Sequence, residues 1–210
     1  ALIENITGES EDVYVQRNVF EPLGMRDTRF LPAAKACGPH QVRGAAIAWE
    51  PGAAGDCQAG TWSTELLARI APTAIDEDAR GDAGMNPDLD YLLRGTVHDT
   101  TARRMGGVAG HAGVFSTAQD VAVFAQALLD RLAGRPSEFP LTQATLELMT
   151  TPQQPGHNAE QLVAANAARN AVDPKYPAIE GQNLRGFGWD IDTYLSWPRG
   201  VVFPIGSFGH

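Results

Sequence analysis

The residues whose types and spacing could do chemistry gather around one Gly-rich run. His98 and Asp99 precede the run GGVAGHAGVFST (residues 106–117), which contains His111. An imidazole beside a carboxylate can act as a general acid/base pair, and neutral imidazole also ligates metals. A metal-dependent hydrolase that uses His98, Asp99 and His111 is therefore one hypothesis. Hydrogen-bonded loop histidines are the favoured interpretation, because the two histidines lack the close spacing of a helical or hairpin ligand pair, and we expect no bound metal.

The glycines of this run allow unusual backbone angles and a close approach of the backbone to a ligand. With a helix N-terminus directly after it, the run could cradle an anion or a phosphate. It has neither the Lys-Ser/Thr of a P-loop nor the glycine spacing and later acid of a dinucleotide site. The pattern therefore favours a tight loop in which Ser116 or Thr117 caps the following helix.

No serine of the sequence occupies a known nucleophile motif. Gly-x-Ser-x-Gly, the nucleophile elbow, is one residue short at Gly206-Ser207-Phe208-Gly209. Ser-x-x-Lys would place a hydroxyl and an activating amine on one helix face, but none of the serines has a lysine three residues later. We therefore expect no serine nucleophile within these residues.

Composition and charge are those of a folded globular protein. The chain has 210 residues, of which 43% are hydrophobic and 20% charged, and its net charge is −9. An acidic chain without a Lys/Arg cluster lacks the positive charge that binds phosphates, so we expect no nucleic-acid partner. No apolar run approaches the roughly 18–20 residues of a membrane-spanning helix, and the first residues lack the basic and apolar regions of a signal peptide.

Cys37 and Cys57 are the two cysteines of the chain and lie in a Gly/Ala-rich stretch. In an exported protein they could pair and pin this loop, whereas in a reducing cytosol they would stay two thiols. Two cysteines without paired histidines nearby do not make a structural zinc site. The sequence leaves the pairing open.

Three segments have the pattern of helices, and the expected spans are residues 9–20, 117–133 and 142–150. The first should begin at Ser10 and stop near Pro22, which disfavours helical geometry in the residue before it. The second has apolar side chains at helical spacing, and Thr117 and Asp120 form a capping pattern at its start.

Strands are expected mainly at the end of the chain. Residues 31–104 form a loop-rich region with room for a short strand and a short helix. Residues 186–197 and 201–208 are rich in aromatic and β-branched residues, so we predict two strands of one hairpin with a turn at residues 198–200. Helices first and sheet last is an α+β order, and the absence of a linker or repeat favours one domain.

Several segments together resemble one known family. Two patterns carry the resemblance: PLGM-x-DT-x-F at residues 22–30 and Ala-Gly-x-x-Ser-Thr-Ala-x-Asp at residues 112–120. LRGFGWDID (residues 184–192) and IGSFGH (residues 205–210) follow in order. In this combination the chain resembles the serine β-lactamase and penicillin-binding-protein-like hydrolases. The branch it resembles most holds class C-like β-lactamases, D-Ala-D-Ala carboxypeptidases and esterases.

The resemblance implies a serine β-lactamase/transpeptidase-like fold, in which an antiparallel sheet is flanked by helices and an all-helical region, with no metal or organic cofactor. It implies hydrolysis of an amide or ester through an acyl-serine intermediate. The family's substrates are small molecules or peptidoglycan-type peptides: β-lactams, D-Ala-D-Ala peptides and carboxylic esters. Its members are often periplasmic or secreted, and we expect the same compartment here.

Two residues receive candidate site roles from the resemblance. Members of the family carry Ser-x-x-Lys, a tyrosine motif such as Tyr-x-Asn, and a Lys/His-Thr-Gly strand motif. By position, His210 matches the first residue of the His-Thr-Gly variant, where it would help to bind the substrate carboxylate or polarise the site. His111 is a candidate for substrate contact, with packing inside its loop as the favoured role.

The chain also departs from the family pattern. Ser-x-x-Lys and Tyr-x-Asn are missing, and His210 is the last residue. In the family the first two motifs precede the PLGM pattern, so we expect residues 1–210 to be a single incomplete domain, cut at both ends and inactive by itself. The alternative is a non-catalytic binding module or pseudoenzyme of the same fold. The sequence indicates no oligomeric state.

Overall fold

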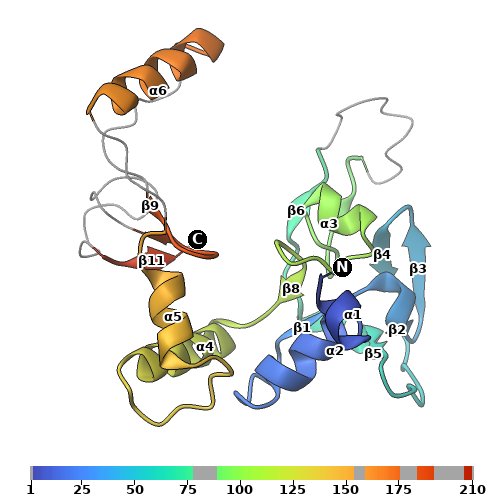
Figure 1. The fold of residues 1–210 in the computed structure, drawn as a ribbon. Coiled ribbons are helices and arrows are strands. Elements are labelled where there is room, and N and C mark those ends of the chain that lie inside the picture. Colours follow the sequence, from blue (N-terminus) through green and yellow to red (C-terminus); the bar gives the residue numbers. More distant parts are fainter. Residues whose placement is uncertain (1, 78–88, 154–158, 176–183, 192–205, 210) are drawn as a thin grey trace. The chain divides into compact units, whose positions relative to one another are not determined.

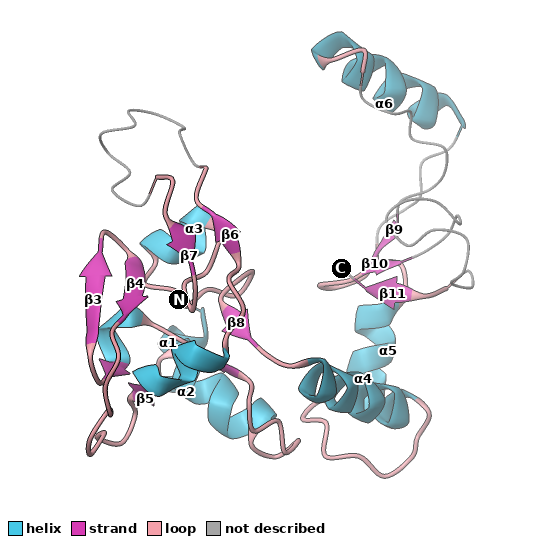
Figure 2. Cartoon of the chain, turned by 180° about the vertical axis from the view of Figure 1, so that it is seen from behind, coloured by secondary structure: helices cyan, strands magenta, loops and turns pink. Residues whose placement is uncertain are grey.

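The computed structural model of the chain describes residues 2–77, 89–153, 159–175, 184–191 and 206–209 (Figure 1). In this part of the chain, helices and small, mostly antiparallel sheets make an α+β fold, as predicted (Figure 2). The chain forms two compact units, which comprise residues 1–127 with 138–140 and residues 128–137 with 141–210. The single incomplete domain over residues 1–210 stays a prediction.

The first unit contains these helices: α1 (Leu2–Thr7), α2 (Glu11–Val15), the π-helical turn η1 (Gln16–Phe20), the 3-10 turns η2 (Ala33–Lys35) and η3 (Thr64–Arg69), α3 (Thr100–Arg104) and the start of α4 (Ala118–Leu132). Its strands lie in pairs: β1 (Arg29–Phe30) with β8 (Val114–Phe115), β2 (Ala36–Cys37) with β5 (Trp62–Ser63), β3 (His40–Arg43) with β4 (Ala46–Trp49), and β6 (Ala74–Ile75) with β7 (Leu92–Leu93). Of these pairs, β2 and β5 run parallel and the others antiparallel.

The first predicted helix is present and ends where the sequence places its stop. α2 continues through η1, and the Met25 N–H donates to the Phe20 carbonyl at 2.9 Å just beyond it. Gly24 has a φ of +71°, a left-handed angle that glycine adopts without strain. Ser10 stands at the N-cap position of α2, but its side chain makes no capping hydrogen bond.

The loop-rich region contains a small core of its own. Four buried side chains form it: Leu31, Ile47, Trp62 and Leu67. Each such side chain stabilises the fold by about 1.5–3 kcal/mol through burial. The Trp62 Nε1–H donates to the Pro32 carbonyl at 2.9 Å, so the polar atom of the largest core side chain is paired. The β3–β4 hairpin and η3 are the short strand and short helix expected here.

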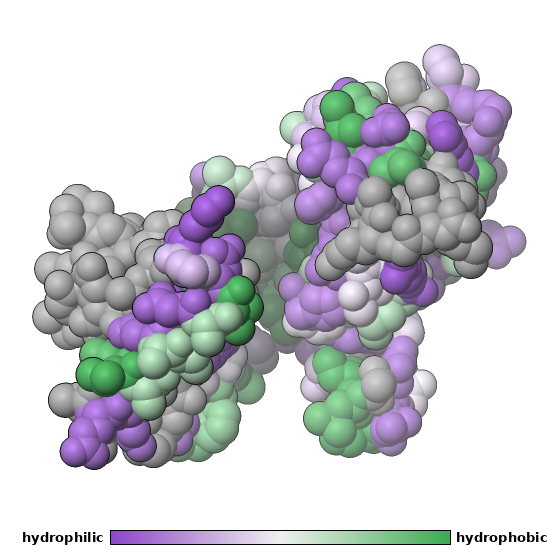
Figure 3. Space-filling view, turned by 90° about the horizontal axis from the view of Figure 1, so that it is seen from above, coloured by the Kyte–Doolittle hydropathy of each residue, from purple (hydrophilic) through white to green (hydrophobic). Residues whose placement is uncertain are grey.

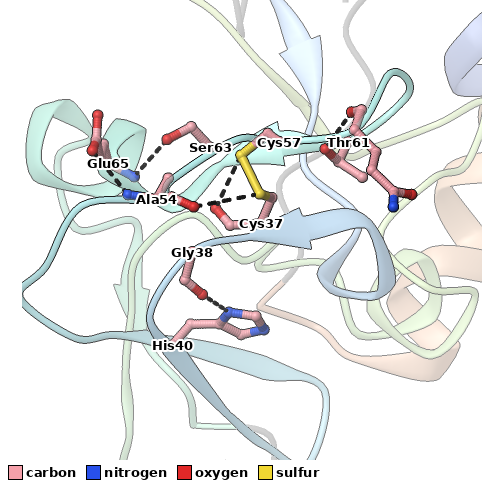
Figure 4. Close-up of a disulfide and its surroundings, with 9 residues drawn as sticks. Cys37, Gly38, His40, Ala54, Cys57, Thr61, Ser63 and Glu65 are labelled. Atoms are coloured by element: carbon pink, nitrogen blue, oxygen red, sulfur yellow. Dashed lines mark hydrogen bonds between the residues drawn. A yellow bond between two sulfur atoms is a disulfide. The ribbon is translucent and has the colours of Figure 1, made fainter.

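The two cysteines form a disulfide (Figure 4). Cys37 ends β2, Cys57 lies in the loop between β4 and β5, and their Cα atoms are 5.7 Å apart. The loop between them is also held by Glu65, whose Oε1 accepts the Ala54 N–H at 3.0 Å. The disulfide thus joins the parallel β2–β5 pair to the loop that precedes β5 and answers the question that the sequence leaves open.

The two helices predicted after the Gly-rich run are present as α4 and as α5 (Gln143–Thr150). At the start of α5, the Thr145 N–H donates to Thr142 Oγ1 at 3.2 Å. Leu146 lies on the buried face of this helix and is 1% exposed. A threonine cap followed by apolar residues at helical spacing therefore predicts both helices correctly.

The second unit also contains a small sheet in the order β11-β10-β9, formed by β9 (Leu184–Arg185), β10 (Asp190–Ile191) and β11 (Phe208–Gly209). Ile191 lies opposite Phe208 in an antiparallel register, which confirms the predicted pairing of these two stretches. The predicted turn at residues 198–200 lies outside the described residues. β9, which pairs with β10 on its other side, is not expected from the sequence.

The helix α6 (Ala159–Val172) is also missed by the sequence analysis. Its polar and apolar residues are not separated into two opposite faces. Polar and apolar residues lie side by side on the surface that Figure 3 shows. Val163 and Val172 are 70% and 78% exposed. None of the described helices has the length and apolar character needed to cross a membrane.

Candidate functional site

A buried carboxylate joins the two sequence patterns, named here the PLGM segment (residues 22–30) and the Ala-Gly segment (residues 112–120). Asp120 Oδ2 accepts the Asp27 N–H at 2.9 Å and the Thr28 hydroxyl at 2.8 Å. Asp120 is 7% and Thr28 1% exposed. The Asp-Thr of one segment and the final Asp of the other are therefore two halves of one hydrogen-bond network.

Two hydroxyls of the Ala-Gly segment complete this network. The Thr28 and Ser116 hydroxyl oxygens are 2.7 Å apart, and Thr117 Oγ1 accepts the Asp120 N–H at 3.1 Å to cap α4. The predicted cap at Thr117 is confirmed. Ser116 is engaged with Thr28, so the serine-threonine pair of this segment serves to hold the structure.

The same two segments also pair as strands. β1 and β8 are antiparallel, with Phe30 opposite Val114. Directly before β8, Gly113 has a φ of +120°, and a Cβ at this position would collide with the Gly107 carbonyl and come within 3.2 Å of the Phe30 ring. Because only glycine fits this close approach, the glycine of the Ala-Gly segment is required by packing.

The Gly-rich run makes a tight turn that carries one of the candidate residues. The Ala112 N–H donates to the Ala109 carbonyl at 3.3 Å, and His111 lies within this turn. His111 Nε2 is 3.1 Å from Asp99 Oδ1, and both side chains are largely exposed. The structure therefore brings together the imidazole and the carboxylate that the sequence suggests as an acid/base pair.

Asp99 has a second partner, which explains its ionisation. Its Oδ1 accepts the Ala102 N–H at 2.8 Å and so caps α3. This backbone hydrogen bond, followed by the bond to His111, lowers the pKa of the Asp99 carboxyl below its usual 3.8. Asp99 is thus an ionised acceptor at neutral pH that orients the His111 ring. The other ring nitrogen of His111 has no hydrogen-bond partner among the described residues.

His98 does not join this pair, because no hydrogen bond connects it to Asp99 or His111. It lines a cavity instead. Within the described residues, no three His, Cys, Asp or Glu side chains are grouped as metal ligands. The described residues therefore contain the pair of Asp99 and His111. They do not contain the group of three ligands that the metal-dependent hypothesis requires.

The cavity lies in the first unit and has a volume of about 550 Å³. Its wall is formed by parts of β1, η3 and β8 and by Val97 and His98. An ion pair between Arg69 and Asp27, at 3.1 Å, and the side chain of Arg29 supply its charges. Sequence reasoning misses this cavity, because its walls come from segments that are far apart in the chain and have no shared pattern.

The other predicted site residue, His210, lies outside the described residues. β11 ends at Gly209, directly before it, and is paired with β10. The role of His210 beside the substrate stays a prediction.

Comparison with known proteins agrees with the sequence patterns. The family model "Beta-lactamase" matches residues 1–210. A protein of Escherichia coli (strain K12) named "Putative D-alanyl-D-alanine carboxypeptidase" is 31% identical over 131 residues, which are 61% of this chain and 24% of that protein. A protein of the same name from Salmonella agona (strain SL483) is 32% identical over the same shares. The chain thus spans 24% of the length of these curated relatives.

Two solved structures of the simvastatin synthase LovD from Aspergillus terreus are also similar. The unliganded selenomethionyl form has a TM-score of 0.44 and the LovD6 mutant a TM-score of 0.48, each at 20% identity. They cover 90% and 91% of this chain, which corresponds to 36% and 37% of their own. At these scores the assignment rests on the family model, whose match over residues 1–210 includes the PLGM segment, the Ala-Gly segment and the final sheet. The chain belongs to the Beta-lactamase family.

Proposed function

We propose that this chain is part of a serine hydrolase that cleaves the terminal D-Ala from D-Ala-D-Ala peptides. The observation that carries the proposal is the identity of 31% over 131 residues with a protein named as a carboxypeptidase of this kind. The match of the Beta-lactamase family model to residues 1–210 supports the proposal at the level of the family.

The proposed chemistry is acyl transfer in two steps. A serine hydroxyl attacks the carbonyl carbon between the two D-Ala residues while a neighbouring base takes its proton. The carbon–nitrogen bond breaks, the amine of the terminal D-Ala leaves with a proton, and an acyl-serine ester remains. Water then attacks the ester, which releases the shortened peptide and returns the proton to serine. Backbone N–H groups stabilise the oxyanion in both steps.

In this proposal the nucleophile comes from residues outside the chain. No serine here is followed three residues later by lysine, and the relatives are about four times as long as the matched region. The 210 residues would supply the Gly-rich turn with His111 as a substrate contact and His210 as the start of the strand motif. By themselves they are expected to be inactive.

The test uses the intact protein and a peptide substrate. We expect release of free alanine from diacetyl-Lys-D-Ala-D-Ala, and no release from the same peptide ending in D-Ala-L-Ala. The isolated 210-residue chain should release none. An intact, cooperatively folded protein that releases no D-Ala would contradict the carboxypeptidase proposal, and failure to hydrolyse a nitrophenyl ester or a chromogenic β-lactam as well would favour a non-catalytic binding module.

A further inference from the structure

We propose that the 550 Å³ cavity of the first unit binds a small organic carboxylate with an apolar body. The proposal goes beyond the acyl-serine chemistry, because no step of that chemistry uses the cavity. It rests on three properties of the described residues: an unpaired cation in the wall, apolar side chains around it, and a suitable volume.

The cation is Arg29. Its guanidinium donates to the Arg26 carbonyl at 2.6 Å, and no carboxylate among the described residues pairs with it. Arg29 is half-buried, and opposite charges attract each other more strongly at such a position than in bulk water. A guanidinium offers five donors in a planar fork that matches a carboxylate, and the bond to Arg26 uses few of them.

The other charges of the cavity largely cancel. Arg69 and Asp27 both line the wall and form an ion pair at 3.1 Å. Among the arginine and aspartate side chains of the lining, the charge that is left unpaired is therefore that of Arg29. A ligand with one negative charge leaves no unpaired charge in the complex, whereas a dianion or a cation would.

Apolar side chains form much of the remaining wall: Leu31, Leu66, Ile70, Val97 and Phe115. The volume of about 550 Å³ falls within the range of small-molecule sites, roughly 300–1,000 Å³. Small-molecule sites combine such an apolar lining with a few polar groups that orient the ligand. An N-acylated amino acid with an apolar side chain has this composition, with its carboxylate placed on Arg29.

Arg29 also lines a second cavity of about 540 Å³, so the experiment must separate the two. In that second cavity the other two cations are already paired: Lys35 with Asp12 at 2.5 Å and Arg17 with Glu9 at 2.7 Å. Ile70 lines the first cavity and has no part in the second. A larger side chain at position 70 therefore fills the first cavity and leaves the second cavity open.

The test measures binding of N-acetyl-L-phenylalanine to the intact protein by isothermal titration calorimetry. We expect binding of the acid and at least about tenfold weaker binding of its neutral amide, because the amide lacks the charge that Arg29 pairs. Arg29→Met should weaken binding of the acid by a similar factor, and Ile70→Trp should abolish it. Arg26→Met removes the same charge outside the cavity and should leave the affinity unchanged.

Equal binding of acid and amide would overturn the proposal, and so would an unchanged affinity in Arg29→Met or Ile70→Trp. No binding of the acid to the folded wild-type protein would overturn it too. Thermal unfolding of each variant shows whether it is folded. Arg29→Lys keeps the positive charge but loses the planar guanidinium, so a folded Arg29→Lys protein should bind the acid with an affinity between those of the wild type and Arg29→Met. Release of D-Ala is measured on the same proteins, so that loss of this site and loss of the carboxypeptidase activity are distinguished.

Discussion

Asp120 is the residue on which the PLGM and Ala-Gly segments converge. It is nearly buried, and its Oδ2 accepts one backbone N–H and one hydroxyl of the opposite segment. In this buried position the carboxylate accepts hydrogen bonds from two donors, the Asp27 N–H and the Thr28 hydroxyl, that water would otherwise have to accept. The acid of the Ala-Gly pattern is therefore explained by a structural task rather than by contact with substrate.

Replacing Asp120 with alanine should destabilise the intact protein by about 2–3 kcal/mol, because the Asp27 N–H and the Thr28 hydroxyl lose a charged acceptor. Urea unfolding measures the change. Gln119→Ala is the control on the same helix: the Gln119 side chain is exposed, so its loss should cost less than about 1 kcal/mol. Equal destabilisation by both variants would contradict the assigned role of Asp120.

The Asp99–His111 pair gives a prediction in pH. The Asp99 pKa is lower in the folded chain than in the unfolded chain, so its stabilising contribution is present above the unfolded pKa of 3.8 and is lost as the pH falls through the folded value. Because the Ala102 N–H is the larger cause and His111 the smaller one, His111→Ala should raise the Asp99 pKa only part of the way to 3.8. An NMR titration of the Asp99 carboxyl carbon measures this.

A wild-type Asp99 pKa at or above 3.8 would show that neither bond forms in solution. Full restoration to 3.8 in His111→Ala would show that the cap of α3 does not contribute.

Among the elements, the β1–β8 pair and the Gly-rich turn depend on one glycine. Gly113 combines a left-handed backbone with a contact to the Gly107 carbonyl that excludes any Cβ. Since the obstacle is backbone, it cannot move aside as a flexible side chain would. The turn that presents His111 therefore depends on the residue that follows it by two positions.

Gly113→Ala should lower the unfolding temperature strongly, because it adds both an unfavourable φ and a steric clash, together worth more than about 2 kcal/mol. Gly110→Ala in the same turn is the control. Gly110 does not have a left-handed angle, and a Cβ there would meet only Glu11 Oε1 at 3.5 Å, an ordinary contact. Differential scanning calorimetry of both variants checks the prediction, and a Gly113→Ala protein as stable as Gly110→Ala would contradict it.

The elements differ in how far the sequence predicts them, for physical reasons. α4 and α5 are predictable because a threonine cap and apolar residues at helical spacing agree locally. α6 is missed because it has no clear apolar face, and helices without one give little periodic signal. The strands of the first unit are two to four residues long, too short for alternation to identify them.

The candidate site was predictable only in part. The sequence identifies His111 and Asp99 as residues able to act together, but their contact depends on how the turn folds back on the start of α3. Thr28 and Asp120 are 92 positions apart, and no local pattern reveals their hydrogen bond. The cavity and Arg29 were missed because a pocket is formed by tertiary structure alone.

At the scale of the whole molecule, the chain is a member of the Beta-lactamase family that spans 24% of its carboxypeptidase-named relatives. The described residues supply the Asp120 network, the turn with His111 and the small final sheet. In the function proposed above, the nucleophile and its base would come from residues other than these 210. The two parts together would make the acyl-serine hydrolase.

The most direct measurement is the mass of the intact protein after incubation with benzylpenicillin. This β-lactam acylates the nucleophilic serine of such enzymes, and the acyl-enzyme ester hydrolyses slowly enough to be detected. We predict an increase equal to one penicilloyl group, and peptide mapping should place it on a serine that lies outside residues 1–210 and has a lysine three residues later. An adduct on one of the serines within residues 1–210 would contradict the account. So would a folded protein that forms no adduct and releases no D-Ala.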